Sequence, residues 1–233
     1  MPKFKISKIL NNEIFLSEED ELHIKKSLRK KIGDKLSCFD DLNEYKTIIK
    51  STDKLKLEIV SKHALSNDIL NINIFLGVID KNNFELALRK LNEINCKSIT
   101  PVFFERSQKN IKLNFERLSK IISESSKQCY RHIDLKINNS INFNELIKEI
   151  ENNKFNILAY QDASEKNLFD DIKYNDKINL IVGPEGGFSE RELEILRKNC
   201  SFLKLTNTIL KSETAAIYLA SILTFNIGNK NEK

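Results

Sequence analysis

The stretch IVGPEGGFSERE, residues 181–192, places three glycines and one proline within five positions of a 233-residue chain that holds six glycines in all. It follows the apolar run INLIV (178–182) and leads into SERELEIL (189–196). The latter is typical of a capping box, in which the Ser189 hydroxyl accepts from the amide of Glu192 and the Glu192 carboxylate accepts from the amide of Ser189. GPEGGF is therefore predicted to be a turn from a strand to a helix.

Glycines in such a turn allow a positive φ and let a ligand lie against bare backbone. In an open α/β sheet, the crevice beyond the carboxyl ends of the strands is the usual ligand site. Two familiar phosphate-binding loops are excluded, because the stretch has neither a GK[ST] ending nor GxGxxG spacing. We expect a ligand at this turn; the alternative is a tight turn that binds nothing.

A second loop has comparable features. The segment LKLTNTILKSETAAIYLA (203–220) passes from a short apolar run through a polar turn into a helix opened by Ser212, with Glu213 near the positive end of the helix. Two neighbouring strands that end in irregular loops, each followed by a helix, are suited to enclose a small flat molecule.

The periodicity of apolar residues changes along the chain. Short strand-like runs dominate residues 1–70, and one of them places Leu55, Leu57 and Ile59 on a single face. From residue 71, strands alternate with amphipathic helices, which predicts a mostly parallel sheet covered on both faces. The first of these helices carries Phe84, Ala87, Leu88, Leu91 and Ile94 at helical spacing.

We therefore expect an α/β protein with a small β-rich domain over 1–70 and an α/β domain over 71–233, joined near residues 66–73. The longest apolar tract, 215–225, is too short to cross a bilayer, and the opening MPKFKISK lacks the apolar region of a signal peptide, so a cytoplasmic protein is expected. The four cysteines form no CxxC pair, which indicates reduced structural thiols rather than a metal site or a disulfide framework. They are Cys38, Cys96, Cys129 and Cys200.

GPEGGFSERE followed by LTNTILKSETAA (205–216) resembles the paired motifs GPEGGxSxxE and LGxRILRxETA of the SPOUT-class methyltransferases. The resemblance is closest to the family that methylates N3 of one uridine in 16S ribosomal RNA of the small subunit. It extends to HIKKSLRKKIGD (23–34), which is similar to the family's HxxxVLRxxxGD, to the region from Leu86 to Ser107, and to Gln128 and Arg131, which match QxxR. Nearly the whole chain is covered.

The resemblance implies a SPOUT-type α/β domain with a deep trefoil knot over about 155–225 and an N-terminal PUA-like β-barrel that holds RNA. It also implies a homodimer that shares its RNA site, acts on 16S ribosomal RNA or the small subunit, and needs no membrane or metal. S-adenosylmethionine is the implied cofactor. Its implied contacts are Leu158, Gly183, Glu185, Gly186, Gly187, Leu205, Thr206, Ile209, Leu210 and Thr214.

The polar residues suggest further roles. Uridine N3 carries a proton, so a cation near O2 or O4 and a proton acceptor are needed. Arg117, Glu124, Gln128 and Arg131 form a narrow stripe along a helix predicted at about 112–130, and the alternative is a solvated stripe. With the family match, the candidate catalytic residues are Arg106, Glu124, Gln128 and Arg131.

The stretch KKSLRKKIGDK (25–35) is strongly basic, in a chain whose formal charge is +5. Either it is a lysine-rich solvated surface or it contacts phosphates. The candidate RNA-binding residues are Lys25, Lys26, Arg29, Lys30, Lys31 and Lys211.

The second motif departs from the family pattern at Thr206, where glycine is usual, and at Lys211, which replaces an arginine and lacks its planar fork. Three hypotheses follow. The first is an S-adenosylmethionine-dependent RNA methyltransferase, and the second is a catalytically inactive or differently targeted RNA-binding SPOUT protein. The third is a metabolic α/β enzyme whose glycine loop holds a phosphate.

Overall fold

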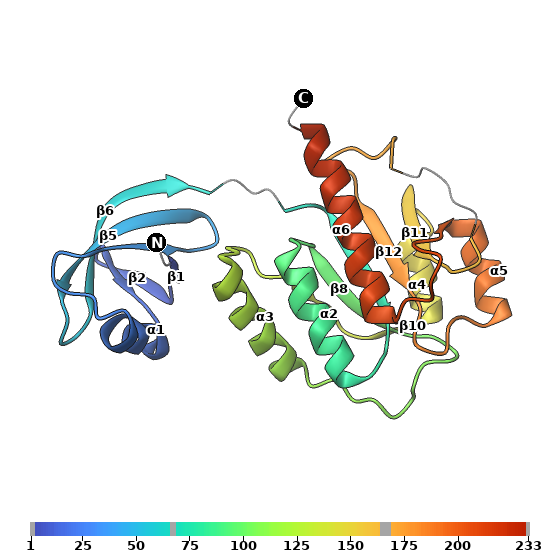
Figure 1. Cartoon of the computed structure of the whole chain (residues 1–233), viewed down its shortest axis with the longest axis horizontal. Coiled ribbons are helices and arrows are strands. Elements are labelled where there is room, and N and C mark those ends of the chain that lie inside the picture. Colours follow the sequence, from blue (N-terminus) through green and yellow to red (C-terminus); the bar gives the residue numbers. More distant parts are fainter. Residues whose placement is uncertain (1–2, 66–68, 164–168, 232–233) are drawn as a thin grey trace. The chain divides into compact units, whose positions relative to one another are not determined.

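The computed structural model describes residues 3–65, 69–163 and 169–231 (Figure 1). Of the expected boundary segment 66–73, residues 66–68 lie outside the described residues. The chain divides into two compact units. The first combines Met1–Asp68 with Ser126–Ile133, and the second combines Ile69–Ser125 with Asp134–Lys233.

The described residues of the first unit form a six-stranded sheet in the order β1-β4-β5-β6-β3-β2, in which β1 pairs with β4 in parallel and the other pairs are antiparallel. Leu55, Leu57 and Ile59 all pack into its core, as the alternation predicts. β1, β2, β4 and the short helical segments were not among the elements expected from the sequence. The elements are β1 (Lys3–Lys5), β2 (Lys8–Leu10), β3 (Glu13–Phe15), α1 (Glu18–Leu22), the π-helical turn η1 (His23–Ser27), β4 (Lys35–Phe39), β5 (Asn43–Ser51) and β6 (Lys56–Ala64).

The second unit contains a seven-stranded sheet in the order β10-β8-β7-β12-β11-β13, with β9 beside β8. All of its described pairings are parallel, so the predicted parallel sheet is confirmed. Its strands are β7 (Ile72–Gly77), β8 (Ser98–Phe103), β9 (Lys136–Ile137), β10 (Ile141–Asn142), β11 (Phe155–Ala159), β12 (Ile178–Val182) and β13 (Ser201–Leu203). Its helices are α2 (Lys81–Glu93), α3 (Phe115–Cys129), α4 (Phe143–Ile150), α5 (Glu190–Asn199) and α6 (Ser212–Asn231), and the part of α3 from Ser126 onward belongs to the first unit.

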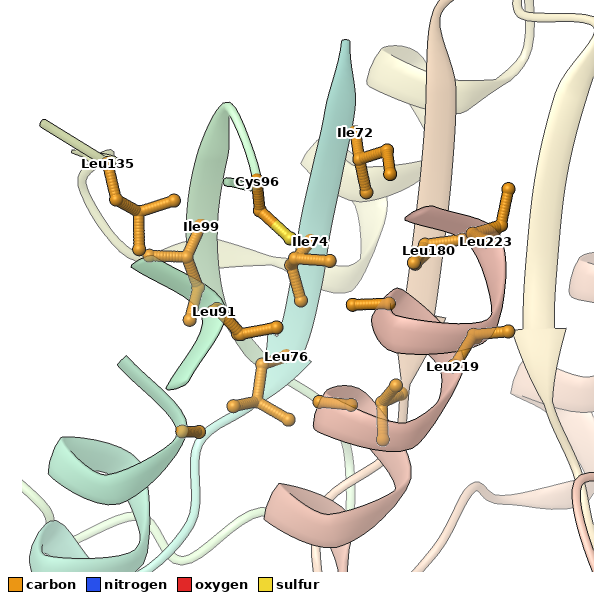
Figure 2. Packing of buried hydrophobic residues seen from close by; sticks show 14 of the residues in the cluster. Ile72, Ile74, Leu76, Leu91, Cys96, Ile99, Leu135, Leu180, Leu219 and Leu223 are labelled. Atoms are coloured by element: carbon orange, nitrogen blue, oxygen red, sulfur yellow. The ribbon is translucent and has the colours of Figure 1, made fainter. Parts of the chain in front are cut away.

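Helices cover both faces of this sheet, as predicted. Successive residues of a strand point to opposite faces, so Leu180 of β12 joins the core with α2, α3 and α6, while Ile181 joins the core with α4 and α5. Figure 2 shows the first of these cores between β7, β12, α2 and α6, with the side chains of Ile72, Ile74, Leu76, Leu91, Leu180, Leu219 and Leu223. No helix in the described ranges is both long and apolar enough to cross a membrane.

The end of β7 touches the glycine loop that follows β12. These two strands are neighbours, with Leu76 opposite Val182, and a Cβ atom at Gly77 would lie 2.3 Å from the backbone nitrogen of Pro184. No side chain fits into that distance. A glycine at the end of β7 is therefore needed for the glycine loop to lie where it does.

The predicted capping box is present at the start of α5. The Ser189 amide donates to Oε2 of Glu192 at 2.9 Å, and the Glu192 amide donates to the Ser189 hydroxyl at 3.3 Å. The second carboxylate oxygen, Oε1, accepts from the amide of Glu105 at 2.8 Å. Glu192 is buried, and it thereby fastens the loop after β8 to the start of α5.

Gly77→Ala is expected to destabilise the protein by about 1–3 kcal/mol, because the added methyl group meets backbone that cannot rotate away. Denaturant unfolding measures the change. Gly228→Ala is the matched control: no atom lies within 4 Å of a Cβ at Gly228, which is in α6, so this substitution is expected to stabilise by about 0.5–1 kcal/mol. Equal stability of the two variants would contradict the close approach at Pro184.

Glu192→Ala is expected to cost about 2–3 kcal/mol, because it leaves the amides of Ser189 and Glu105 without their acceptor. Glu194→Ala, at an exposed position of the same helix, is expected to change stability by less than about 0.5 kcal/mol. Thermal unfolding of both variants measures the difference. A cost for Glu192→Ala no larger than that for Glu194→Ala would show that the carboxylate does not hold these segments.

Candidate active site

A cavity of about 710 Å³ lies at the carboxyl edge of the parallel sheet in the second unit. Its lining includes residues 159–161 after β11, residues 182–188 after β12 and most of residues 205–215 between β13 and α6. All three segments leave neighbouring parallel strands at the same edge, which is where ligands bind in open α/β sheets. The volume is in the range usual for small-molecule sites.

The glycines of the loop after β12 serve the packing of the protein itself. A Cβ at Gly183 would lie 2.9 Å from the ring of Phe188, and a Cβ at Gly186 would lie 2.9 Å from the carbonyl oxygen of Arg106. Gly187 has a φ of +69°, and its amide donates to the carbonyl of Pro184 at 2.9 Å, which closes a tight turn. From the sequence, a ligand or a positive φ was the expected reason for glycines in this loop. The structure adds a third reason, which is that neighbouring atoms leave no room for a side chain.

The loop after β8 contributes polar groups to the same site. Arg106 lines the cavity, and its Nη1 donates to the carbonyl of Gly186 at 3.4 Å. Gln108 donates from Nε2 to Oε2 of Glu185 at 2.7 Å. Both contacts join this loop to the glycine loop, so Arg106 is held at the cavity by residues far away in sequence.

Glu213 also lines the cavity, as the second residue of α6. It is only 5% exposed, and its Oε2 accepts no hydrogen bond from any residue that the structure describes. The amide of Ala215 donates to the carbonyl of Lys211, so Lys211 directly precedes α6, which begins at Ser212 where the sequence predicts the helix to open.

Most of the predicted cofactor-binding residues line this one cavity. Leu158 and Thr214 are outside the described lining: Leu158 is fully buried in the core with α4 and α5, and Thr214 is exposed. Thr206 stands where the family has glycine. Its hydroxyl donates to the carbonyl of Thr208 at 2.7 Å, a hydrogen bond within the loop between β13 and α6. The predicted residues in the lining are Gly183, Glu185, Gly186, Gly187, Leu205, Thr206, Ile209 and Leu210.

Several lining residues were not named individually among the predicted site residues. Tyr160 and Gln161 directly follow β11, at the loop after FNILAY (155–160) that the family resemblance implies as one of three cofactor loops, so the segment was predicted although these two residues were not named. Asn83 comes from the start of α2, which no motif of the sequence connects to the loops.

Of the other predicted catalytic residues, Glu124 belongs to the second unit, whereas Gln128 and Arg131 belong to the first. Glu124 and Gln128 are exposed on α3, and Arg131 is buried just beyond that helix, where its Nε donates to the carbonyl of Ile133. None of the three is in the described lining. The predicted helix at 112–130 is otherwise confirmed as α3.

Arg117, the first member of the predicted stripe, is held in an ion pair with α2. Its Nε and Nη2 donate to the two carboxylate oxygens of Glu85 at 2.6 and 2.9 Å. These hydrogen bonds hold the pKa of the buried Glu85 carboxyl below its ordinary value. This guanidinium is therefore part of the packing of α3 against α2.

The basic stretch 25–35 lies in the first unit, on η1 and the loop after it. Lys25 is engaged there: its Nζ donates to the carbonyl of Asp53 at 2.8 Å. Lys26, Arg29 and Lys31 are exposed, whereas Lys30 is half-buried. Lys211, from the second unit, is exposed at the cavity.

The described residues contain no group of three or more His, Cys, Asp or Glu side chains that is arranged to hold a metal ion. The four cysteines are free thiols. Burial raises the pKa of the Cys38 and Cys200 thiols to about 12, which makes both of them poor nucleophiles.

Comparison with known proteins agrees with this architecture. Residues 66–224 match the RNA methyltransferase domain family, and residues 16–60 match the RNA methyltransferase PUA domain family. Two similar proteins are the ribosomal RNA small subunit methyltransferases E of Buchnera aphidicola and Rickettsia conorii. The first is 32% identical over 94% of this chain and 90% of the relative, and the second is 31% identical over 89% and 87%.

Two solved structures share the fold. A probable rRNA-methyltransferase from Porphyromonas gingivalis has a TM-score of 0.84 at 21% identity, covering 99% of this chain and 100% of the other. Ribosomal RNA small subunit methyltransferase E from Neisseria gonorrhoeae, solved with S-adenosyl methionine, has a TM-score of 0.80 at 20% identity, covering 97% of each chain. With two family matches and relatives above 30% identity over most of its length, this chain belongs to the ribosomal RNA small subunit methyltransferase E family, a group of RNA methyltransferases with a PUA domain.

Proposed function

We propose that this protein transfers a methyl group from S-adenosylmethionine to N3 of one uridine in 16S ribosomal RNA. The observation that carries the proposal is the cavity at the carboxyl edge of the sheet, because the two motifs that resemble the family meet there. Because the chain belongs to a methyltransferase family, we expect the ligand of this cavity to be a methyl donor. The chain's net charge of +5 is also compatible with an RNA partner, because RNA is negatively charged.

The cavity suits the cofactor in size and chemistry. Gly183, Gly186 and Gly187 line the cavity and carry no side chain, so a purine or a ribose can approach their backbone closely. When bound, S-adenosylmethionine supplies a methyl group on a positively charged sulfur. The residues that we assign to it are Gly183, Glu185, Gly186, Gly187, Leu205, Thr206, Ile209 and Leu210, together with the backbone that follows Leu158.

Arg106 is the residue that we assign to the uridine. N3 becomes a nucleophile only when its proton is lost, and the negative charge then spreads to O2 and O4 of the ring. A guanidinium at the cavity edge stabilises that charge, and the contacts with the glycine loop hold it there before the RNA arrives. We expect the proton to leave to water or to a carboxylate at the cavity.

The remaining predicted residues are assigned to the RNA. We assign the exposed Glu124 and Gln128 to contacts with the RNA, and the buried Arg131, whose Nε donates to the carbonyl of Ile133, to the support of the same region. The exposed cations Lys26, Arg29, Lys31 and Lys211 are proposed to contact phosphates, with Lys25 and Lys30 contributing charge from less exposed positions. The homodimer with a shared RNA site and the knot over about 155–225 stay predictions, and residues 164–168 of the knot segment lie outside the described residues.

The proposal is tested with ribosomal RNA from a bacterial strain that lacks N3 methylation of small-subunit uridine. Incubation with the protein and tritiated S-adenosylmethionine is expected to label 16S ribosomal RNA at a single uridine, located by mass mapping of nuclease fragments. Small subunits and free RNA are assayed side by side. Absence of label on both substrates, with the cofactor bound, would leave the inactive RNA-binding protein as the better description.

Arg106→Ala is expected to lower kcat about 100-fold, because the charge that develops on the uridine loses the cation that we assign to it. The affinity for S-adenosylmethionine is expected to change by less than about threefold, because the guanidinium is assigned to the base. Arg89→Ala, at an exposed position of α2 outside the cavity, is the matched control. A loss of cofactor affinity as large as the loss of kcat would move Arg106 from the base to the cofactor.

A further inference from the structure

Among the charged side chains in the described lining of the cavity, Glu213 differs from the rest in its burial. Arg106, Glu185 and Lys211 are exposed, so water screens their charges. Glu213 is 5% exposed. The lining therefore includes one carboxyl group that is largely removed from water.

That buried carboxylate lacks a protein partner for one of its oxygens. Oε2 accepts no hydrogen bond from the described residues, and none of the described ion pairs includes Glu213. A buried carboxylate without a partner costs free energy, and its place in the first turn of α6 offsets only part of that cost. A cation bound inside the cavity would offset the remainder.

We propose that the Glu213 carboxylate binds the positive charge on the sulfonium of S-adenosylmethionine and so makes the site selective for the cationic donor over its neutral product. This inference rests on the proposed function. In the reaction, the bond from the methyl carbon to sulfur breaks and a bond to uridine N3 forms, while N3 gives up its proton. Sulfur keeps the electron pair and becomes a neutral thioether.

The attraction to Glu213 consequently ends when the methyl group has been transferred. The product, S-adenosylhomocysteine, leaves the carboxylate again without a partner, and this favours its release over the donor's. The alternative contacts for Glu213 are the amino group or the ribose hydroxyls. Both are present in donor and product alike, so they give no such selectivity.

The test is calorimetric titration of the whole protein with three ligands: S-adenosylmethionine, sinefungin, which carries an ammonium group in place of the sulfonium, and S-adenosylhomocysteine. Glu213→Gln keeps the shape and removes the charge. It is expected to weaken binding of the two cationic ligands about tenfold, the effect of a partly screened charge pair, and to change binding of the neutral product less than twofold.

Glu190→Gln is the matched control, because it removes an exposed carboxylate from the first turn of α5, outside the cavity lining. It is expected to change none of the three affinities by more than twofold. Thermal unfolding without ligand confirms that Glu213→Gln is folded. The wild-type protein supplies a measurement that needs no variant: it is expected to bind sinefungin at least tenfold more tightly than S-adenosylhomocysteine.

An equal loss of affinity for all three ligands in Glu213→Gln would overturn the inference and leave the proposed function intact, since Glu213 would then contact a group that donor and product share. Unchanged affinity for the two cationic ligands would overturn it as well. Failure of the wild-type protein to bind any of the three ligands would overturn both the inference and the proposed function.

Discussion

The Glu192 carboxylate is the interaction on which the rest of the site depends. One of its oxygens accepts from the amide that starts α5, and the other accepts from the amide of Glu105 after β8. Two loops that are 87 residues apart in the chain are thereby fixed to a single buried group. Because both amides would otherwise lack an acceptor, the geometry of the glycine loop is stabilised by hydrogen bonding as well as by its short turn.

The parallel sheet places the loops so that they enclose the cavity. Since β11, β12 and β13 run in the same direction, the loops that follow them gather at one edge, and α6 closes one side of the space they surround. The close approach at Gly77 brings the glycine loop over the end of β7. Packing thus holds the backbone around the cavity in place. The loops therefore lose little conformational freedom when a ligand binds.

Charged side chains are distributed unevenly around this cavity. Their distribution agrees with the two roles that we propose, which are binding of the RNA base and binding of the cationic donor. Arg106, which we assign to the RNA base, is exposed, and Glu213, which we assign to the cationic donor, is buried; both line the cavity. A methyl transfer that moves positive charge from donor to acceptor needs opposite electrostatic surroundings at its two ends. In this proposal, the basic stretch of the first unit adds attraction for the phosphates of the RNA and takes no part in the chemical step.

The sequence by itself determined the alternation of strands and helices, the turn from β12 to α5, and the capping box, because each depends on residues close together in the chain. Ser189 and Glu192 are three residues apart, and the periodic apolar positions of α2 all lie on one helix. Only the tertiary structure decided that Gly77 must lack a side chain, that Arg106 meets the glycine loop and that Arg117 is paired with Glu85. It also decided that Glu213 is buried and that its Oε2 accepts no hydrogen bond from the described residues. Those facts depend on contacts between segments tens of residues apart, and the sequence of either segment carries no record of the other's position in space.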